Sequence, residues 1–251
     1  MSRWSWWAVG LGAYVAFTVT SFPAGTALRW FAPPGLTAAG VTGTLWSGSA
    51  ASCSVGGFTA EALRWRVRPT SLLLGRIAAE IDARIPDGFV QGVVTASPST
   101  VRFSDLRGGT SLPALASLLP LKGMRGQASV ALDELVLEDG WPATIVGQLK
   151  LAGLETAPLI PDGSGSLLPL GDYTITFRPA PPGALAARFV DDGGPLEVSG
   201  DLNMDNTRTY TIDALIEPRA GAPESLVEGL KFMTAEPDAE GRRRLNLTGS
   251  L

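Results

Sequence analysis

The hydrophobic and polar positions of this chain follow two different patterns. Residues 4–27 form an apolar stretch, and no charged side chain occurs between Arg3 and Arg29. Beyond it, many short segments alternate apolar and polar side chains with a period of two, which is typical of strands with one buried face. The strictest alternation sets Ile77, Ala79, Ile81, Ala83 and Ile85 against Arg76, Glu80, Asp82 and Arg84. The pattern therefore predicts an apolar helix followed by a β-rich domain.

The apolar stretch is long enough to cross a membrane. At about 1.5 Å of rise per residue, roughly 20 residues span a hydrocarbon core of about 30 Å. Aromatic residues stand near both ends of the stretch, as they do at membrane interfaces. We expect a short cytoplasmic tail and a single-pass anchor within residues 1–31, and a separate domain over residues 32–251. The expected anchor residues are Trp4, Trp6, Trp7, Leu11, Tyr14, Phe17, Phe22 and Trp30.

A cleaved signal peptide is the alternative explanation of this stretch. Its apolar region would be shorter, about 7–15 residues, and would follow a more strongly charged start than the single Arg3. Arg3 and the α-amino group nearly balance Arg29 under the positive-inside rule, so the charges alone do not orient the segment. The bulk of the chain follows the stretch, which favours export of the domain.

The rest of the chain predicts an antiparallel meander with one apolar face. Its 30 glycines and 19 prolines fit a β-rich chain with many turns better than a helical bundle. Short helices are expected at 71–75, 111–119 and 222–232, and a hairpin turn at 191–194. Strands are expected at 63–67, 76–85, 89–96, 100–106, 126–137, 143–154, 173–178, 185–190, 195–204, 210–216 and 242–251.

The composition removes most catalytic and metal chemistry. The chain has no histidine, which excludes histidine-containing triads and most zinc sites, and its single cysteine, Cys53, has no partner for a disulfide within the chain. Phosphate-binding and nucleophile-elbow motifs are absent from the sequence. Residues 201–212 start like a calcium loop but lack its glycine and its closing glutamate. We expect no catalytic, cofactor or metal site, and no enzymatic activity.

The charge distribution also argues against nucleic acid as a partner. The formal net charge is −4, and the only dense basic run is residues 242–244. Nucleic-acid phosphates require extended Lys/Arg patches. We therefore interpret this run as the solvated start of the last strand.

Three short motifs resemble the type II secretion system protein N family. Residues 41–48 read Val-Thr-Gly-Thr-Leu-Trp-Ser-Gly, a Leu-Arg-Trp strand at 63–65 leads to a proline and a Leu-Leu-Gly stretch, and a Gly-Arg sequence opens the final strand at 241–251. Because glycines let strands bend and tryptophans supply apolar area, we expect structural roles for these motifs. The motif residues are Gly43, Thr44, Leu45, Trp46, Gly48, Trp65, Pro69 and Gly75.

The resemblance implies a bacterial inner-membrane protein with a periplasmic β-rich domain. Such a protein would be an accessory, scaffolding part of the machine that exports folded proteins through an outer-membrane secretin. Its partners would be the membrane, the inner-membrane platform and the component that links the platform to the secretin.

A more distant resemblance, to AsmA-like periplasmic folds, implies a curved sheet with an apolar inner groove and a lipid-binding or lipid-transport role. An open apolar groove would favour this lipid-carrying alternative, whereas a filled core would favour the scaffold.

Overall fold

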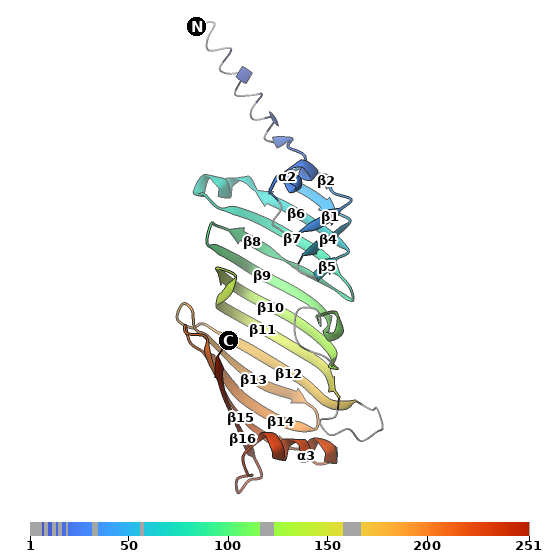
Figure 1. The fold of residues 1–251 in the computed structure, drawn as a ribbon, viewed down its shortest axis with the longest axis vertical. Helices are drawn as coiled ribbons and strands as arrows, with labels where there is room; N and C mark the ends of the chain where they lie inside the picture. The colour runs from blue at the N-terminus through green and yellow to red at the C-terminus, as the bar shows by residue number, and fades with distance from the viewer. Residues whose placement is uncertain are drawn as a thin grey trace.

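The molecule is a long antiparallel meander, described by a computed structural model for residues 7, 10–11, 14, 17–18, 20–31, 35–55, 58–115, 123–157 and 167–250. Thirteen of the described strands form one sheet, in which almost every strand pairs with the next one along the chain (Figure 1). In sheet order these strands are β2 (Thr42–Gly43), β3 (Ser47–Ala50), β6 (Ala62–Arg68), β7 (Ile77–Ile85), β8 (Gly88–Ala96), β9 (Thr100–Ser111), β10 (Arg125–Glu138), β11 (Trp141–Thr156), β12 (Leu168–Arg178), β13 (Leu185–Gly193), β14 (Leu196–Met204), β15 (Thr209–Pro218) and β16 (Arg243–Ser250).

A small second sheet and several short helices complete the described fold. The second sheet has the order β1-β4-β5 and lies beside the N-terminal end of the large sheet (Figure 1). The remaining bounds are β1 (Thr37–Ala39), β4 (Ser52–Val55), β5 (Phe58–Ala60), the α-helices α2 (Ala24–Phe31) and α3 (Glu224–Met233), and the 3₁₀ helices η1 (Pro69–Leu74) and η2 (Leu112–Leu115). The predicted mainly β, antiparallel class is confirmed.

Bulges make the strands longer and more bent than the alternation predicted. β9 runs on to Ser111 because Asp105 takes a left-handed φ of 52° and lets the pairing with β10 continue past it. β10 and β11 shift register between Leu132 and Glu134. Opposite that shift, a Cβ on Gly147 would lie 2.3 Å from the Ala131 carbonyl oxygen. Bulges of this kind bend a sheet and increase its twist.

The helix predicted at 111–119 is a 3₁₀ helix in its described part and begins one residue later. The segment 111–119 begins with Ser111, which pairs with Gln127 as the end of β9, and continues only as the 3₁₀ helix η2. Residues 116–119 lie outside the described residues. Leu112 of η2 is buried against Ala128 and Leu154, so packing on the sheet holds the short turn in place.

The predicted anchor is only partly described. Trp4 and Trp6 lie outside the described residues, whereas Trp7, Leu11, Tyr14 and Phe17 have helical backbone and expose between 66% and 80% of their surface. No helix in the described part of the chain is both long enough and apolar enough to cross a membrane. The anchor therefore stays a prediction.

The chain leaves its helical start at Pro23. Phe22 has no assigned secondary structure, Pro23 forms an isolated β-bridge with Thr44, and α2 begins at the next residue. Proline has no backbone N–H to continue a helix, which explains the break within the apolar stretch. The ring centroids of Phe22, just before α2, and Trp30, in its last turn, lie 5.8 Å apart, so these two predicted anchor aromatics pack together.

The motif residues meet where the N-terminal segment joins the sheet. The Trp65 ring N–H donates to the Leu45 carbonyl oxygen at 3.2 Å, and the Leu45 N–H donates to the Phe22 carbonyl oxygen at 2.9 Å. Trp46 is half-buried, and its carbonyl oxygen accepts from the Val67 N–H at 2.7 Å. These contacts tie the first residues of the domain to β6.

Glycines make this junction possible. Gly43 has a φ of 89°, and a Cβ on it would lie 2.5 Å from the Ser47 carbonyl oxygen. Gly48 pairs with Trp65, and a Cβ on it would lie 2.4 Å from the Trp65 ring. Downstream, Pro69 opens η1 and Gly75, with a φ of 67°, follows its end. The motifs thus lie at bends and close approaches of the backbone. Glycine fits there because it has no Cβ, and proline because its φ is already fixed.

The C-terminal end is closed by α3 and β16. α3 was expected at 222–232, and its inner side chains pack on one face of the sheet in a cluster made of Leu226, Leu230, Leu196, Val198 and Ile216. The expected terminal strand is confirmed as β16, which pairs with β15 along its whole length.

We expect Leu226→Ala to lower the free energy of unfolding by about 2–5 kcal/mol, because it removes a side chain that is 7% exposed and leaves a cavity between α3 and the sheet. Phe232→Ala is the matched control on the same helix, because Phe232 is 81% exposed and should change stability by less than about 0.5 kcal/mol. Denaturant titration measures both. Equal losses would mean that α3 does not pack as described.

Gly48→Ala should lower stability by about 1–3 kcal/mol, because the new methyl group overlaps the Trp65 ring and the Thr42 carbonyl oxygen. Gly25→Ala is the control, because a Cβ on this α2 residue meets nothing within 4 Å and should be neutral or stabilising by up to about 1 kcal/mol. Thermal unfolding of both variants would refute the close approach if Gly48→Ala matched the wild type.

Candidate functional site

One face of the large sheet carries almost only apolar side chains. Residues paired directly across antiparallel strands point to the same face, so the register defines that face without ambiguity. We call it the inner face. Its side chains follow one another across the strands in pairs such as Trp65 with Ile81, Ala79 with Val94, Phe103 with Leu135, and Leu149 with Ile175.

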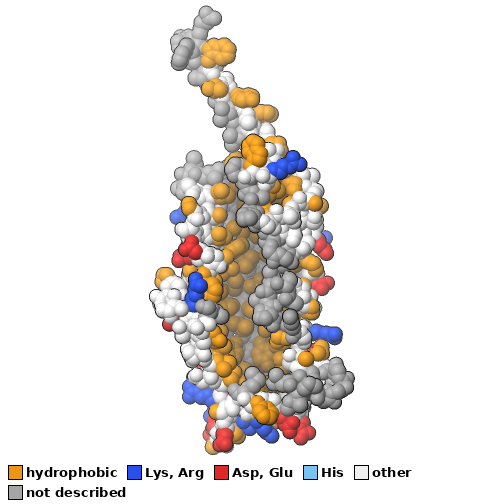
Figure 2. All heavy atoms as spheres, in the orientation of Figure 1, with side chains coloured by type: hydrophobic (Ala, Val, Ile, Leu, Met, Phe, Trp, Pro, Cys, Tyr) orange, Lys and Arg blue, Asp and Glu red, His pale blue; other side chains and the backbone are white. Residues whose placement is uncertain are grey.

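The inner face forms an open trough rather than a filled core. Figure 2 shows a hollow that runs along the molecule with hydrophobic side chains on its floor. Only small clusters of the described residues are buried, and no large described side chain is fully enclosed. Ile77 on this face keeps 54% of its surface exposed. A single sheet with an apolar face normally buries it against a second layer, and along most of this sheet the described residues supply none.

The described residues cover the trough mainly at its ends. At the C-terminal end, Leu226 and Leu230 of α3 lie on the inner face. At the N-terminal end, Ala24 and Ala27 of α2 are buried, and α2 lies next to β2 (Figure 1). Between the two helices, Leu112 of η2 packs on the inner face at Ala128 and Leu154, and Ala60 of the small sheet packs at Ala83 and Ile85.

A defined cavity lies at the α2 end. It has a volume of about 510 Å³, which is within the usual range for small-ligand pockets. We call it the α2 pocket. None of its lining residues is charged: they are Ala24, Ala27, Leu28, Leu36, Ala38, Leu45, Ala50, Cys53, Leu63, Trp65, Val67, Ile77, Ala79 and Ile81. Burial raises the pKa of the Cys53 thiol, so this residue stays neutral in the apolar wall.

Two motif residues contribute to this pocket. Leu45 and Trp65 lie in its wall, and Gly48 leaves the space that the Trp65 ring occupies. Of the other motif residues, Trp46, Pro69 and Gly75 belong to the sheet junction and do not line the pocket. The sequence predicted structural roles for the whole group but did not predict that its members face a cavity. The only sequence pattern that pointed to this wall was the period-two alternation of apolar residues within 63–67 and within 77–81.

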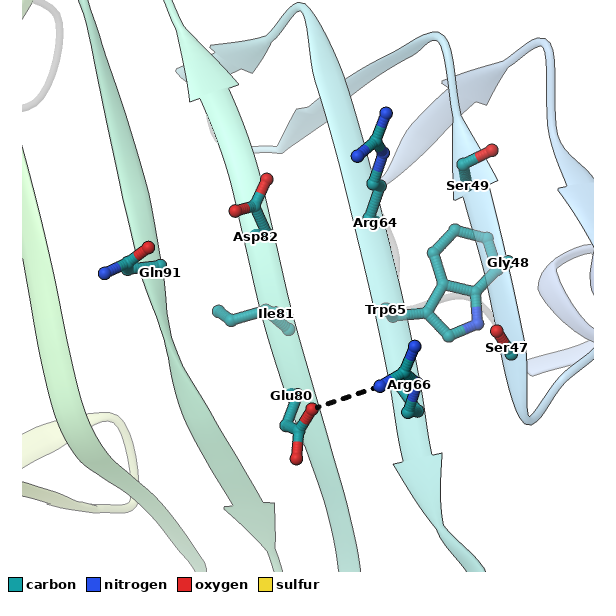
Figure 3. A pocket seen from close by; sticks show the side chains of 10 residues that line it. All are labelled: Ser47, Gly48, Ser49, Arg64, Trp65, Arg66, Glu80, Ile81, Asp82 and Gln91. Atoms are coloured by element: carbon teal, nitrogen blue, oxygen red, sulfur yellow. Dashed lines mark ion pairs between the residues drawn. The ribbon is translucent and has the colours of Figure 1, made fainter.

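The outer face of the same strands is polar and crossed by ion pairs. Figure 3 shows Arg64, Arg66, Glu80 and Asp82 in a shallow polar depression, with the ion pair between Arg66 and Glu80 at 4.0 Å. Arg68 also binds Glu80 at 2.7 Å, and its hydrogen bond holds the pKa of that carboxyl below its usual value. These groups are solvent-exposed, and Glu80 pairs with both Arg66 and Arg68, so they form a polar, hydrated outer surface.

One compensated ion pair lies at the C-terminal end of the inner face. Asp191 was expected in a hairpin turn, but it belongs to β13 and its side chain is only 5% exposed. Burial raises the pKa of Asp191, but the Val198 N–H and the Arg219 guanidinium, each 2.7 Å from a carboxylate oxygen, outweigh it, so the net pKa is lowered. Neighbouring Tyr173 has a pKa raised by its own burial and by Asp191. The Asp191–Arg219 ion pair stabilises the turn at 194–196, because Arg219 also donates hydrogen bonds to the carbonyl oxygens of Gly194 and Leu196.

The remaining acidic groups do not assemble a metal or catalytic site within the described residues. No cluster of three or more His, Cys, Asp or Glu side chains there could hold a metal ion. In the calcium-like segment, Asp201 pairs with Arg178 at 2.7 Å, and Asp205 accepts hydrogen bonds from the Thr207 and Thr209 N–H groups. These carboxylates stabilise a strand and a turn, so the most developed site on the described molecule is the apolar trough.

Comparison with known proteins gives a family for this fold. The family model for type II secretion system (T2SS) protein N matches residues 34–246. The chain is 27% identical over 254 residues to type II secretion system protein N of Aeromonas hydrophila, covering 97% of each chain. It is also 27% identical over 230 residues to the protein of the same name from Vibrio cholerae serotype O1, covering 87% of this chain and 86% of the relative. No solved structure matches the chain. Because the family match spans the whole β-rich domain apart from its last strand residues, the chain belongs to the type II secretion system protein N family.

Proposed function

We propose that the protein is a non-enzymatic accessory component of the type II secretion system, anchored in the inner membrane by residues 4–27, with its sheet in the periplasm. The observation that carries this proposal is the family match across residues 34–246. The apolar N-terminal stretch with its terminal tryptophans supports the membrane location.

The length of the sheet and its exposed outer face suit a protein that binds other proteins as a scaffold. Neighbouring strands lie about 4.7–4.9 Å apart, so the large sheet has a contour of about 55–60 Å across its strands. Its polar outer face carries isolated exposed hydrophobic side chains, among them Phe89 on β8 (49% exposed) and Leu215 on β15 (40% exposed). We infer that this face contacts the inner-membrane platform and the secretin-linking component.

Photocrosslinking tests this assignment. Replacing Phe89 by p-benzoylphenylalanine keeps an aromatic ring on the outer face, and irradiation of secreting cells should give adducts with identified secretion-system proteins. Phe189 is the matched control, because it lies on the inner face and packs at the α3 cluster. Adducts at Phe189 but not at Phe89, or a deletion strain with unchanged secretion, would contradict the proposal.

A second function is favoured by the open trough. We propose that the inner face also binds lipid acyl chains, because an apolar surface left open to water is costly and an acyl chain would cover it. The hollow in Figure 2 and the incompletely buried inner-face side chains are the observations that support it. The two functions are compatible, since they use opposite faces of one sheet.

A bulky side chain in the middle of the trough tests the second function. Ile175→Trp fills the inner face of β12, and we expect it to reduce the phospholipid retained by the purified full chain by about fivefold or more. Thr176→Trp is the control, because the next residue along the strand points to the outer face. Quantitative lipid extraction measures both, with thermal unfolding to verify that each variant is folded. Equal retention in the two variants would contradict acyl binding in the trough.

A further inference from the structure

A second cavity beside the α2 pocket carries a positive charge. This second cavity, also about 510 Å³, shares Leu28, Leu36 and Ala38 with the α2 pocket and is lined in addition by Gly25, Arg29, Gly40 and Val41. Among the described residues that line the two cavities, Arg29 is the only one charged at neutral pH. An apolar cavity and a cation thus lie next to each other at this end of the sheet.

Arg29 is available to a ligand. It is exposed in the last turn of α2, and no carboxylate in the described part of the chain forms an ion pair with it. Arg66, Arg68 and Arg102, by contrast, bind carboxylates on the outer face. What sets Arg29 apart from other arginines without an ion pair, such as Arg64, is its place beside the apolar cavity. A cation left without a partner beside an apolar cavity is complementary to an amphiphile with an anionic head.

We propose that the α2 pocket binds one acyl chain of an anionic membrane phospholipid, with the phosphate of its head group at Arg29. The arginine guanidinium suits phosphate oxygens because it can donate two parallel hydrogen bonds. The apolar wall of the pocket, including the exposed Leu45 and Ile77, takes the chain. The inference rests on the proposed membrane anchoring, because α2 begins at the end of the apolar stretch, directly after the break at Pro23, and would lie at the bilayer surface.

The position of the pocket favours lipid binding at the α2 end of the trough over binding at the α3 end. It lies at the end of the trough that adjoins the N-terminal segment, and its walls come from α2, β1, β3, β4, β6 and β7. The opposite end is closed by α3 and by the compensated pair of Asp191 and Arg219. A phospholipid therefore meets a defined apolar pocket beside an unpaired arginine at the α2 end of the trough, whereas the side chains of α3 pack into the opposite end.

The test uses the full chain in phosphatidylcholine nanodiscs that contain a small fraction of photoreactive phospholipid with a diazirine at the end of one acyl chain. One arm carries the diazirine on phosphatidylglycerol and the other carries it on phosphatidylcholine. After irradiation, mass spectrometry maps the adducts. We expect adducts on residues 62–68 and 77–81, with phosphatidylglycerol preferred by about fivefold, the size expected for one partly exposed charge pair.

Three variants sharpen the result. Arg29→Gln should remove the preference for phosphatidylglycerol, whereas Arg64→Gln, which changes an exposed arginine on the outer face, should keep it. Ala79→Trp should remove the adducts at residues 62–81 by filling the pocket. Because this variant could fail to fold, its thermal unfolding is measured, and Arg29→Gln carries the test without it.

The failures are distinguishable from one another. Adducts confined to residues 7–21, which do not line the pocket, would overturn the pocket and leave the membrane anchor standing. Equal labelling of residues 62–81 by both lipids would overturn the assignment of Arg29 to the head group. Adducts only on β9–β12 would overturn the α2 pocket and support the open trough as the acyl site. A chain that does not enter nanodiscs would contradict the proposed anchoring itself.

Discussion

An apolar sheet face that the described fold leaves largely uncovered is the constraint on which the rest of this structure depends. A regular antiparallel meander places its apolar side chains on one face, and a globular domain would cover that face with a second layer. Here α2 and α3 cover its ends, and η2 and the small sheet cover short stretches between them. The opposite face is soluble because arginines and carboxylates pair across neighbouring strands, as Arg102 does with Glu134 and Arg178 with Asp201. The fold thus has a polar, hydrated outer face and an apolar inner face on the two sides of a single sheet.

The alternation of apolar and polar residues predicted the strands well, because each strand has one apolar face and one face exposed to solvent. The segment 76–85 was expected from its strict period of two and is observed as β7 over Ile77–Ile85. The predicted boundaries shifted where tertiary pairing competes with local pattern. The helix expected from Ser111 begins at Leu112, because the backbone of Ser111 pairs with Gln127 as the end of β9. Asp191 looks like a turn residue, yet it pairs with Tyr173 inside β13, and its carboxylate binds Arg219.

The candidate site could be predicted only in part. The apolar face follows from the sequence, since period-two alternation recurs from residues 63–67 to the last strand. The α2 pocket does not, because it joins residues 24–28 to residues 63–81 through a break at Pro23 that no alternation signals. Its existence also depends on Gly48, whose missing side chain makes room for Trp65. Sequence patterns show which side chains are apolar. The cavity between a helix and a sheet depends instead on how the two elements pack against each other, which these patterns do not show.

The strand order has a consequence for how the molecule is assembled. From β6 onward every strand pairs with its neighbours in sequence, so nearly all contacts of the large sheet are local, as in a repeat protein. Such a sheet can grow one strand at a time, each new strand using the previous one as its template. A chain that emerges across a membrane from its N-terminal end could therefore order its first strands before its last ones are made. The trough would lengthen during synthesis, with the end beneath α2 formed first and the cap of α3 added last.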